Sequence, residues 1–168
     1  ATIYVEIIRG TPLLLQLYFF FFLLPMMIPA LETSASFSIT LALCLNSGAY
    51  VAEVIRAGIS AVDKGQTEAA RSLGLNARQT MTKVVFPQAI KNILPALGNE
   101  MITLFKDTSL VSVIALRDVT KQAQNIVSTT YQPYVPYISL AVIYLLGVII
   151  MTKLLGIFER RLRESDRR

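Results

Sequence analysis

Residues 12–31 read PLLLQLYFFFFLLPMMIPAL, an almost wholly apolar run. A helix of about 20 such residues spans the hydrocarbon core of a bilayer. Thr11 is predicted to cap this helix, with Pro12 as its first residue, because hydroxyls suit the N-cap and proline the first helical position. Pro25 and Pro29 should kink or end the helix near its far side. The run therefore predicts a membrane-spanning helix.

Further apolar segments extend this interpretation to the whole chain. A short turn is expected at residues 32–34, and three more spans follow at about 36–55, 88–105 and 134–157. Hydrophobic residues make up 54% of the 168 residues, and mean hydropathy is +0.54, values typical of a lipid-embedded protein. The sequence predicts one all-α integral membrane domain, residues 1–168, with four transmembrane helices.

The basic residues predict the orientation of these spans, because Lys and Arg concentrate in cytoplasmic loops. One basic residue precedes the first span, six lie in residues 56–91, and six lie from residue 153 to the end, whereas three lie between the third and fourth spans. We therefore expect residues 56–91 and both visible ends to face the cytoplasm, and residues 106–133 to face outside.

Composition also excludes several kinds of chemistry. The chain has no histidine, and Cys44 is its one cysteine, so zinc sites, histidine-based triads and an intramolecular disulfide are not expected. We assign no catalytic residue and no metal ligand. The net charge of +5 could suit nucleic acid, but the charges lie between apolar blocks, and we expect no nucleic-acid partner.

The segment between the second and third spans is polar and well capped. Residues 66–88 read QTEAARSLGLNARQTMTKVVFPQ, which predicts two short helices. Thr67 is expected to cap the first helix, Glu68 to favour its dipole near the N-terminus, and Gly74 to end it in a left-handed conformation. Asn76, with a glutamine three residues later, predicts a capping box for the second.

Small side chains in the first of these helices suggest a contact surface. Ala69 and Ala70 leave a narrow face that fits either a groove of another protein or the membrane surface, and helix chemistry leaves both open. The pattern Glu68-Ala69-Ala70, then Gly74, then residues 93–95 as ILP, resembles the EAA loop of permease subunits of bacterial ABC importers. Three flanking blocks resemble the polar amino acid branch of that family: YVEIIRGTPLLLQ at 4–16, SGAYVAEVIRAGI at 47–59 and FKDTSLV at 105–111.

The resemblance implies a type I ABC importer transmembrane domain in the bacterial inner membrane, carrying a polar amino acid. It implies a coupling loop at about 63–87 that seats Glu68, Ala69, Ala70 and Gly74 in a cleft of a separate ATPase. That partner would bind ATP and Mg, since this chain has no phosphate-binding G-x-x-x-x-G-K-[ST] motif and we expect no cofactor in it. A second permease copy or related subunit and an extracytoplasmic solute-binding protein complete the implied assembly.

The same resemblance bears on the start of the chain. Permeases of this family usually have about five transmembrane helices, and the sequence begins at Ala1, just before what resembles the second. We therefore expect the sequence to be truncated at its N-terminus, with four of the five helices visible.

Polar residues within the second span are candidates for a substrate path, because such groups are costly in lipid. Asn46, Tyr50 and Glu53 are spaced to share one helical face. Two structural alternatives stay open: Asn46 could form an interhelical hydrogen bond, and Glu53 could form an ion pair with Arg56.

The third span carries a second set of candidates. Asn92, Asn99, Thr103 and Lys106 are spaced to share a face, and two facing polar stripes would make a wet path. Glu100 lies near mid-span beside Asn99, beyond a proline that frees a backbone carbonyl. We expect Glu100 and Asn99 to contact the ammonium and carboxylate of an amino acid. For Thr103, interhelical hydrogen bonding is the alternative.

The residues just after this span are Lys106, Asp107, Thr108 and Ser109. We assign them to the outer mouth of the path, where the resemblance implies that the solute-binding protein docks. The alternative is that they are the solvated start of a loop.

Two other functional classes fit less well. A carrier or channel driven by an ion gradient would show inverted repeats or a selectivity-filter motif, and neither is visible. A membrane-embedded enzyme would need a nucleophile with a base, and the chain has no histidine to supply one.

Overall fold

The computed structural model describes residues 2–29, 34–114 and 116–164, and this part of the chain is built from helices without strands, which confirms the all-α prediction. Two short π-helical segments, η1 and η3, and one 3-10 helix, η4, interrupt or extend the α-helices. In chain order the elements are α1 Thr2–Arg9, α2 Leu13–Tyr18, η1 Phe19–Leu23, α3 Leu24–Met27, α4 Ala35–Ser60, α5 Lys64–Ser72, α6 Ala77–Thr80, η3 Met81–Val85, α7 Phe86–Asp107, η4 Thr108–Ile114, α8 Val119–Thr130 and α9 Tyr134–Glu164.

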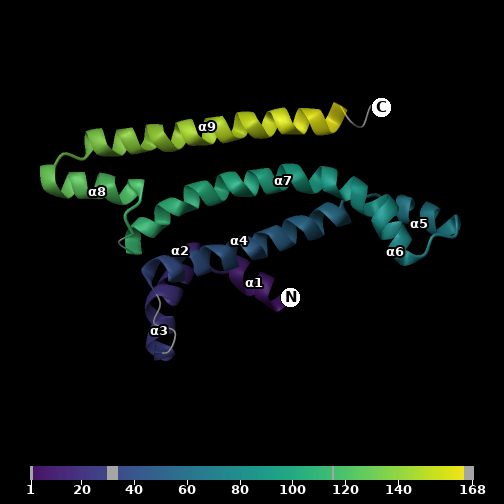
Figure 1. The fold of residues 1–168 in the computed structure, drawn as a ribbon, viewed down its shortest axis with the longest axis horizontal. Coiled ribbons are helices and arrows are strands. Elements are labelled where there is room, and N and C mark those ends of the chain that lie inside the picture. Colours follow the sequence, from purple (N-terminus) through teal and green to yellow (C-terminus); the bar gives the residue numbers. More distant parts are fainter. Residues whose placement is uncertain (1, 30–33, 115, 165–168) are drawn as a thin grey trace.

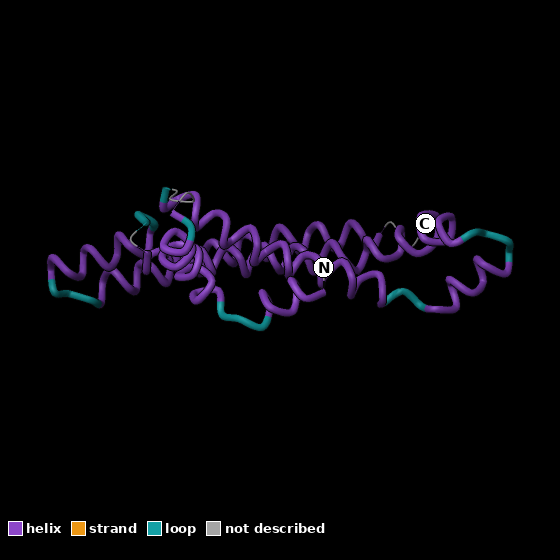
Figure 2. The backbone as a smooth tube through the Cα atoms, turned by 90° about the horizontal axis from the view of Figure 1, so that it is seen from below, coloured by secondary structure: helices purple, strands orange, loops and turns teal. Residues whose placement is uncertain are grey.

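Three long helices, α4, α7 and α9, lie side by side in one layer with α7 in the middle (Figure 1). Figure 2 shows this layer edge-on, as an elongated slab. The loop containing α5 and α6 lies at the same end of the layer as the end of α9 (Figure 1). This arrangement agrees with the expectation that these two segments share one side of the membrane.

Length and apolar character mark α4 and α9 as able to cross a membrane, and the bent pair formed by α1 and residues 13–27 as a third candidate in the described part of the chain. Helix α7 is more polar because it carries Lys91, Glu100, Lys106 and Asp107. It is nevertheless flanked by α4 on one side and α9 on the other, and its buried residues are Ala89, Ile93 and Ile102.

The first apolar run differs from its prediction at its N-terminal end. Helix α1 precedes it, and a bend of 104° separates α1 from residues 13–27. Thr11 does not cap the following helix: its hydroxyl donates to the carbonyl oxygen of Ile7 at 2.9 Å, which extends the bonding of α1, and Pro12 occupies the N-cap position. A threonine hydroxyl can either donate to a preceding backbone carbonyl or accept from a following backbone N–H, and the Thr11 hydroxyl donates.

The far end of the run is close to its prediction. The helix passes through Pro25, which follows the π-helical segment η1, and ends at Met27, before Pro29. A π-bulge accommodates the carbonyl that proline leaves without a donor. Glu32 and Thr33 of the expected turn lie outside the described residues, whereas Ser34 caps α4 by accepting from the Phe37 N–H at 3.3 Å.

Helices are present where the second, third and fourth spans were predicted, and they are longer than predicted; of the three, α4 and α9 are apolar enough to cross a membrane by this measure. Helix α4 covers Ala35–Ser60, α7 covers Phe86–Asp107, and α9 begins at the expected Tyr134 but continues to Glu164. Gly58 lets α4 approach α7, since a Cβ there would overlap the side chain of Ile93. Glycine at a helix contact permits this close backbone packing.

The first helix of the polar loop begins earlier than predicted. Asp63, not Thr67, caps α5, because its carboxylate accepts from the Gly65 N–H at 2.6 Å. Glu68 therefore lies beyond the first turn, where its interaction with the helix dipole is weak. The end of α5 follows the prediction: Gly74 has φ of +86°, and the Leu75 N–H donates to the Ala70 carbonyl at 3.2 Å in a Schellman motif.

The capping box at Asn76 is also confirmed. The Asn76 side chain accepts from the Gln79 N–H at 2.9 Å, and the Gln79 side chain accepts from the Asn76 N–H at 3.0 Å. The helix that it starts is not a separate short helix, however. Elements α6, η3 and α7 follow each other without a break, so one helical rod extends from Ala77 to Asp107.

The segment between α7 and α9 is largely helical, so residues 106–109 do not form the loop start that was the alternative for them. Lys106 and Asp107 form the last turn of α7, and η4 begins at Thr108. Helix α8 then starts at an N-cap aspartate whose side chain accepts from the Lys121 N–H at 2.7 Å. The core of the molecule lies at this end, where α2, α4 and η4 meet; its buried members are Leu17, Ile39, Ala42, Val111 and Ile114.

Candidate functional site

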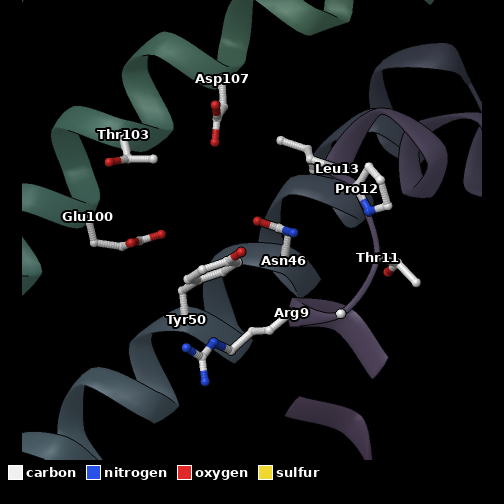
Figure 3. A pocket seen from close by; sticks show the side chains of 10 residues that line it. Arg9, Thr11, Pro12, Leu13, Asn46, Tyr50, Glu100, Thr103 and Asp107 are labelled. Atoms are coloured by element: carbon white, nitrogen blue, oxygen red, sulfur yellow. The ribbon is translucent and has the colours of Figure 1, made fainter. Parts of the chain in front are cut away.

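A polar cavity of about 400 Å³ opens between α4, α7 and the connection from α1 to α2 (Figure 3). Helix α4 contributes Asn46 and Tyr50, and α7 contributes three polar residues one or two turns apart. The full lining comprises Arg9, Gly10, Thr11, Pro12, Leu13, Asn46, Tyr50, Glu100, Thr103 and Asp107. The 104° bend between α1 and α2 is what brings residues 9–13 to this wall.

Four of the predicted path residues meet here: Asn46, Tyr50, Glu100 and Thr103. Asp107, expected at the outer mouth, joins them. Glu100, Thr103 and Asp107 are spaced at i, i+3 and i+7, and therefore lie on one face of α7. The polar stripe facing α4 thus centres on Glu100.

Other predicted residues lie elsewhere. Asn99 is exposed and is not among the residues that line the cavity, because one step along a helix turns a side chain by about 100°. Lys106 is exposed on the same side of α7, and Thr108 and Ser109 lie in η4 beyond the cavity. Glu53 faces a second cavity of about 570 Å³, lined by Thr2, Val5, Glu6, Arg9, Ala52, Glu53 and Arg56.

Glu53 forms the ion pair that was one of its two alternatives. The Arg56 guanidinium donates to both carboxylate oxygens of Glu53, through Nε at 2.8 Å and through Nη2. Arg9 approaches the same carboxylate at 3.6 Å, and its guanidinium lies 5.5 Å from the centre of the Tyr50 ring. Arg9 therefore separates the two cavities and lines both.

Asn46 forms the interhelical hydrogen bond considered for it, while it also lines the cavity. Its Nδ2 donates to Oε1 of Gln16 at 3.0 Å, and both side chains are 6% exposed. The Thr103 hydroxyl donates to the carbonyl of Asn99 within its own helix at 3.2 Å. The structure thus adds Gln16 and Arg9 to the site, two residues that sequence reasoning missed.

Both missed residues left a signal in the sequence. Gln16 is the one amide in the apolar run 12–31, where a polar side chain needs a partner. Arg9 lies just before that run, where a basic residue indicates the orientation of a membrane span. Its contact with Tyr50 depends on the fold and could not be predicted from the sequence.

Comparison with known proteins identifies the family. Residues 1–164 match the family model of the binding-protein-dependent transport system inner membrane component. The chain belongs to this family. It is a permease subunit of an ATP-binding cassette importer with the type I transmembrane fold.

Individual relatives place the permease in the amino acid branch. It is 43% identical to the arginine transport system permease protein ArtQ of Bacillus subtilis, over 99% of this chain and 75% of ArtQ. It is 36% identical to the glutamine transport system permease protein GlnP of Escherichia coli K12, over 97% of this chain and 74% of GlnP. A solved structure described as an amino acid ABC transporter with histidines has 51% identity and a TM-score of 0.89, covering 95% of this chain and 74% of that one. Each of these three relatives is thus named for amino acid transport.

The EAA loop of this permease presents a definite surface. Glu68, Ala69 and Gly74 are exposed, whereas Ala70 is 4% exposed and packs within the chain. Leu73, which the sequence did not single out, is 84% exposed at the end of α5.

Proposed function

We propose that the 400 Å³ cavity is where the amino acid passes through this subunit, with Glu100 accepting hydrogen bonds from its ammonium group. The volume lies within the range of about 300–1,000 Å³ usual for small-ligand pockets. A zwitterion needs acceptors for its ammonium and donors for its carboxylate. The carboxylates of Glu100 and Asp107 supply the first (Figure 3). Arg9 also lines the cavity, and it supplies the second only by turning from its place beside Glu53 and the Tyr50 ring. Asn99, outside the cavity, has no part in this contact.

The acceptors also bear on the choice of substrate. Two carboxylates, an amide and a phenol in one cavity favour an amino acid whose side chain carries N–H donors as well. The relatives are named for arginine and glutamine, and the solved neighbour for histidines, all of which have such side chains. We therefore propose a donor-bearing amino acid as the cargo.

The ATPase partner is proposed to dock on the coupling loop at residues 63–87. Glu68, Ala69, Leu73 and Gly74 form its exposed surface, and Ala70 supports this surface from within. ATP and Mg are then bound by that partner, whose state reaches the permease through packing.

Two further contacts complete the proposed assembly. A polar face of α7 is exposed along its length, at Asn92, Asn99 and Lys106. Polar side chains facing lipid are costly, so a second permease subunit, identical or related, is proposed to cover this face. The solute-binding protein is proposed to dock near Lys106, Thr108 and Ser109 on the outside, with both visible chain ends in the cytoplasm.

Glu100→Gln tests the central proposal, because it keeps the size of the side chain and removes its charge. A hydrogen bond to a charged group contributes about 1.5–3 kcal/mol, so the KM for uptake into proteoliposomes should rise about tenfold to a hundredfold. Membrane insertion and ATPase copurification should persist, since Glu100 lies far along α7 from the loop. Glu6→Gln, which makes the same change in the other cavity, is the matched control. Unchanged KM and maximal rate in an intact Glu100→Gln complex would refute the contact.

A further inference from the structure

The Gln16 side chain occupies the bend between α1 and α2, where backbone carbonyls lack their usual partners. The carbonyl of Ile8 would normally accept from the N–H four residues later, but that residue is Pro12, which has none. The Gln16 Nε2 group fills this role: it lies 2.7 Å from the Ile8 carbonyl oxygen and 3.1 Å from that of Thr11. The amide end of Gln16 is therefore held by the backbone.

These bonds determine which way the Gln16 amide points. A carbonyl oxygen only accepts hydrogen bonds, so the Gln16 group facing Ile8 and Thr11 must be its NH₂. Its Oε1 then faces Asn46 and likewise only accepts. Asn46 must present its own NH₂ to Gln16, as the 3.0 Å contact between Nδ2 and Oε1 requires. The Asn46 Oδ1 is left on the opposite side, toward the cavity.

Figure 3 shows the result: the Asn46 oxygen points toward the side of Glu100 and Asp107, and its nitrogen toward Pro12 and Leu13. We propose that Gln16 is a positioning residue that fixes Asn46 as a hydrogen-bond acceptor in the cavity, and so selects for cargo groups that donate. This inference rests on the proposed function of the cavity, and Gln16 itself does not line it.

The alternative orientation would reverse the character of this wall. A flipped Asn46 amide would turn its NH₂ toward the carboxylates of Glu100 and Asp107 and compete with an ammonium group for them. With Gln16 in place, a flip also sets two carbonyl oxygens against each other in a buried position, where no water compensates. The carbonyls of residues 8 and 11 thus orient the Gln16 amide, and Gln16 in turn orients the Asn46 amide with its oxygen toward the cavity.

Gln16→Met is the first variant, because methionine has similar length and fills the space without fixing Asn46. The full-length permease in its ATPase complex should show a KM for uptake raised about tenfold, the loss of one hydrogen bond to a charged group, with maximal rate and ATPase copurification retained. Asn46→Ala leaves Gln16 on its backbone carbonyls and should raise KM to a similar degree. An unchanged KM in Asn46→Ala overturns the inference even if Gln16→Met fails to assemble.

Rescue separates positioning from simple support of the bend. In the Gln16→Met background, Asn46→Asp presents an oxygen to the cavity in either orientation, so KM should return toward the wild-type value. A loss of support at the bend would not be rescued in this way. Thr103→Asp in the Gln16→Met background is the control, because it adds an equal charge on α7. If Thr103→Asp lowers KM as much as Asn46→Asp does, the added charge and not the position of the acceptor explains the rescue, and the inference fails.

Glu100→Gln distinguishes a failure of the proposed cavity from a failure of the proposed role of Gln16. If it leaves uptake unchanged, the proposed role of the cavity fails. If it weakens uptake while Gln16→Met and Asn46→Ala leave KM unchanged, the cavity stands and the positioning role of Gln16 is overturned.

Discussion

Gly58→Ala should weaken the contact between α4 and α7. Gly58 is buried, and a Cβ at this position would overlap Cγ1 of Ile93 and lie 3.4 Å from its backbone nitrogen. Ile93 cannot easily turn away, because a β-branched side chain in a helix has one strongly preferred rotamer. Overpacking of this kind costs about 1–3 kcal/mol.

Gly156→Ala in α9 is the matched control. A Cβ there meets no atom within 4 Å, so the substitution brings only the gain of replacing a helical glycine, about 0.5–1 kcal/mol. Gly58→Ala brings the same gain, and the difference between the two variants isolates the overlap with Ile93. The scaling of about 2–4 °C per kcal/mol for chains of this size places Gly58→Ala about 2–12 °C below Gly156→Ala.

The assay is thermal unfolding of the purified complex in nanodiscs, with all variants in parallel. Ile93→Ala removes the three side-chain carbons beyond Cβ, including the Cγ1 that the new methyl group of Gly58→Ala overlaps. The double variant should therefore be more stable than the sum of the single changes by about 0.5–3 kcal/mol. Equal midpoints for Gly58→Ala and Gly156→Ala, or purely additive effects in the double variant, would refute the proposed overlap.

Two further predictions concern the loop and the topology. Gly74→Asp should lower ATPase copurification and uptake more than Gly74→Asn does. Asp and Asn both tolerate a left-handed backbone, but only Asp adds a negative charge at a helix C-terminus, which is unfavourable by about 0.3–1 kcal/mol. Wild-type ATPase copurification and wild-type uptake in Gly74→Asp would show that the loop is not the docking site. In a Cys44→Ser background, Gln122→Cys should react with an impermeant thiol reagent only from outside, and Ser72→Cys only from the cytoplasm. Labelling of Gln122→Cys from the cytoplasm alone would reverse the assigned orientation.

Local chemistry accounts for the helix ends that the sequence predicted. Gly74 and the pair formed by Asn76 and Gln79 form their bonds within a few residues, so their conformation depends little on the rest of the fold. Thr67 was a wrong choice of cap because Asp63, four residues earlier, has the same ability to accept a backbone N–H. Local chemistry does not distinguish between two such candidates when both precede a helical segment.

The site was predictable in its residue types and less so in its geometry. Helical spacing groups Asn46 with Tyr50, and Glu100 with Thr103, but it does not say which face of α7 turns toward α4. The structure places Asn99, a predicted path residue, outside the cavity. The wall at residues 9–13 depends on the 104° bend, which hydropathy does not report because α1 and residues 13–27 together are apolar enough for a single span.

Helix α7 and the helical turns before it connect the polar loop to the cavity without a break, and the run bends where α6 and η3 lead into α7 (Figure 1). At 1.5 Å per residue, Glu100 lies about 21 Å along α7 from Phe86, where this helix begins. A lever of that length, tilted by about 7° at its base, moves Glu100 by about 2.6 Å, close to the length of one hydrogen bond. A small tilt of α7 at its loop end is therefore large enough to make or break a hydrogen bond of Glu100.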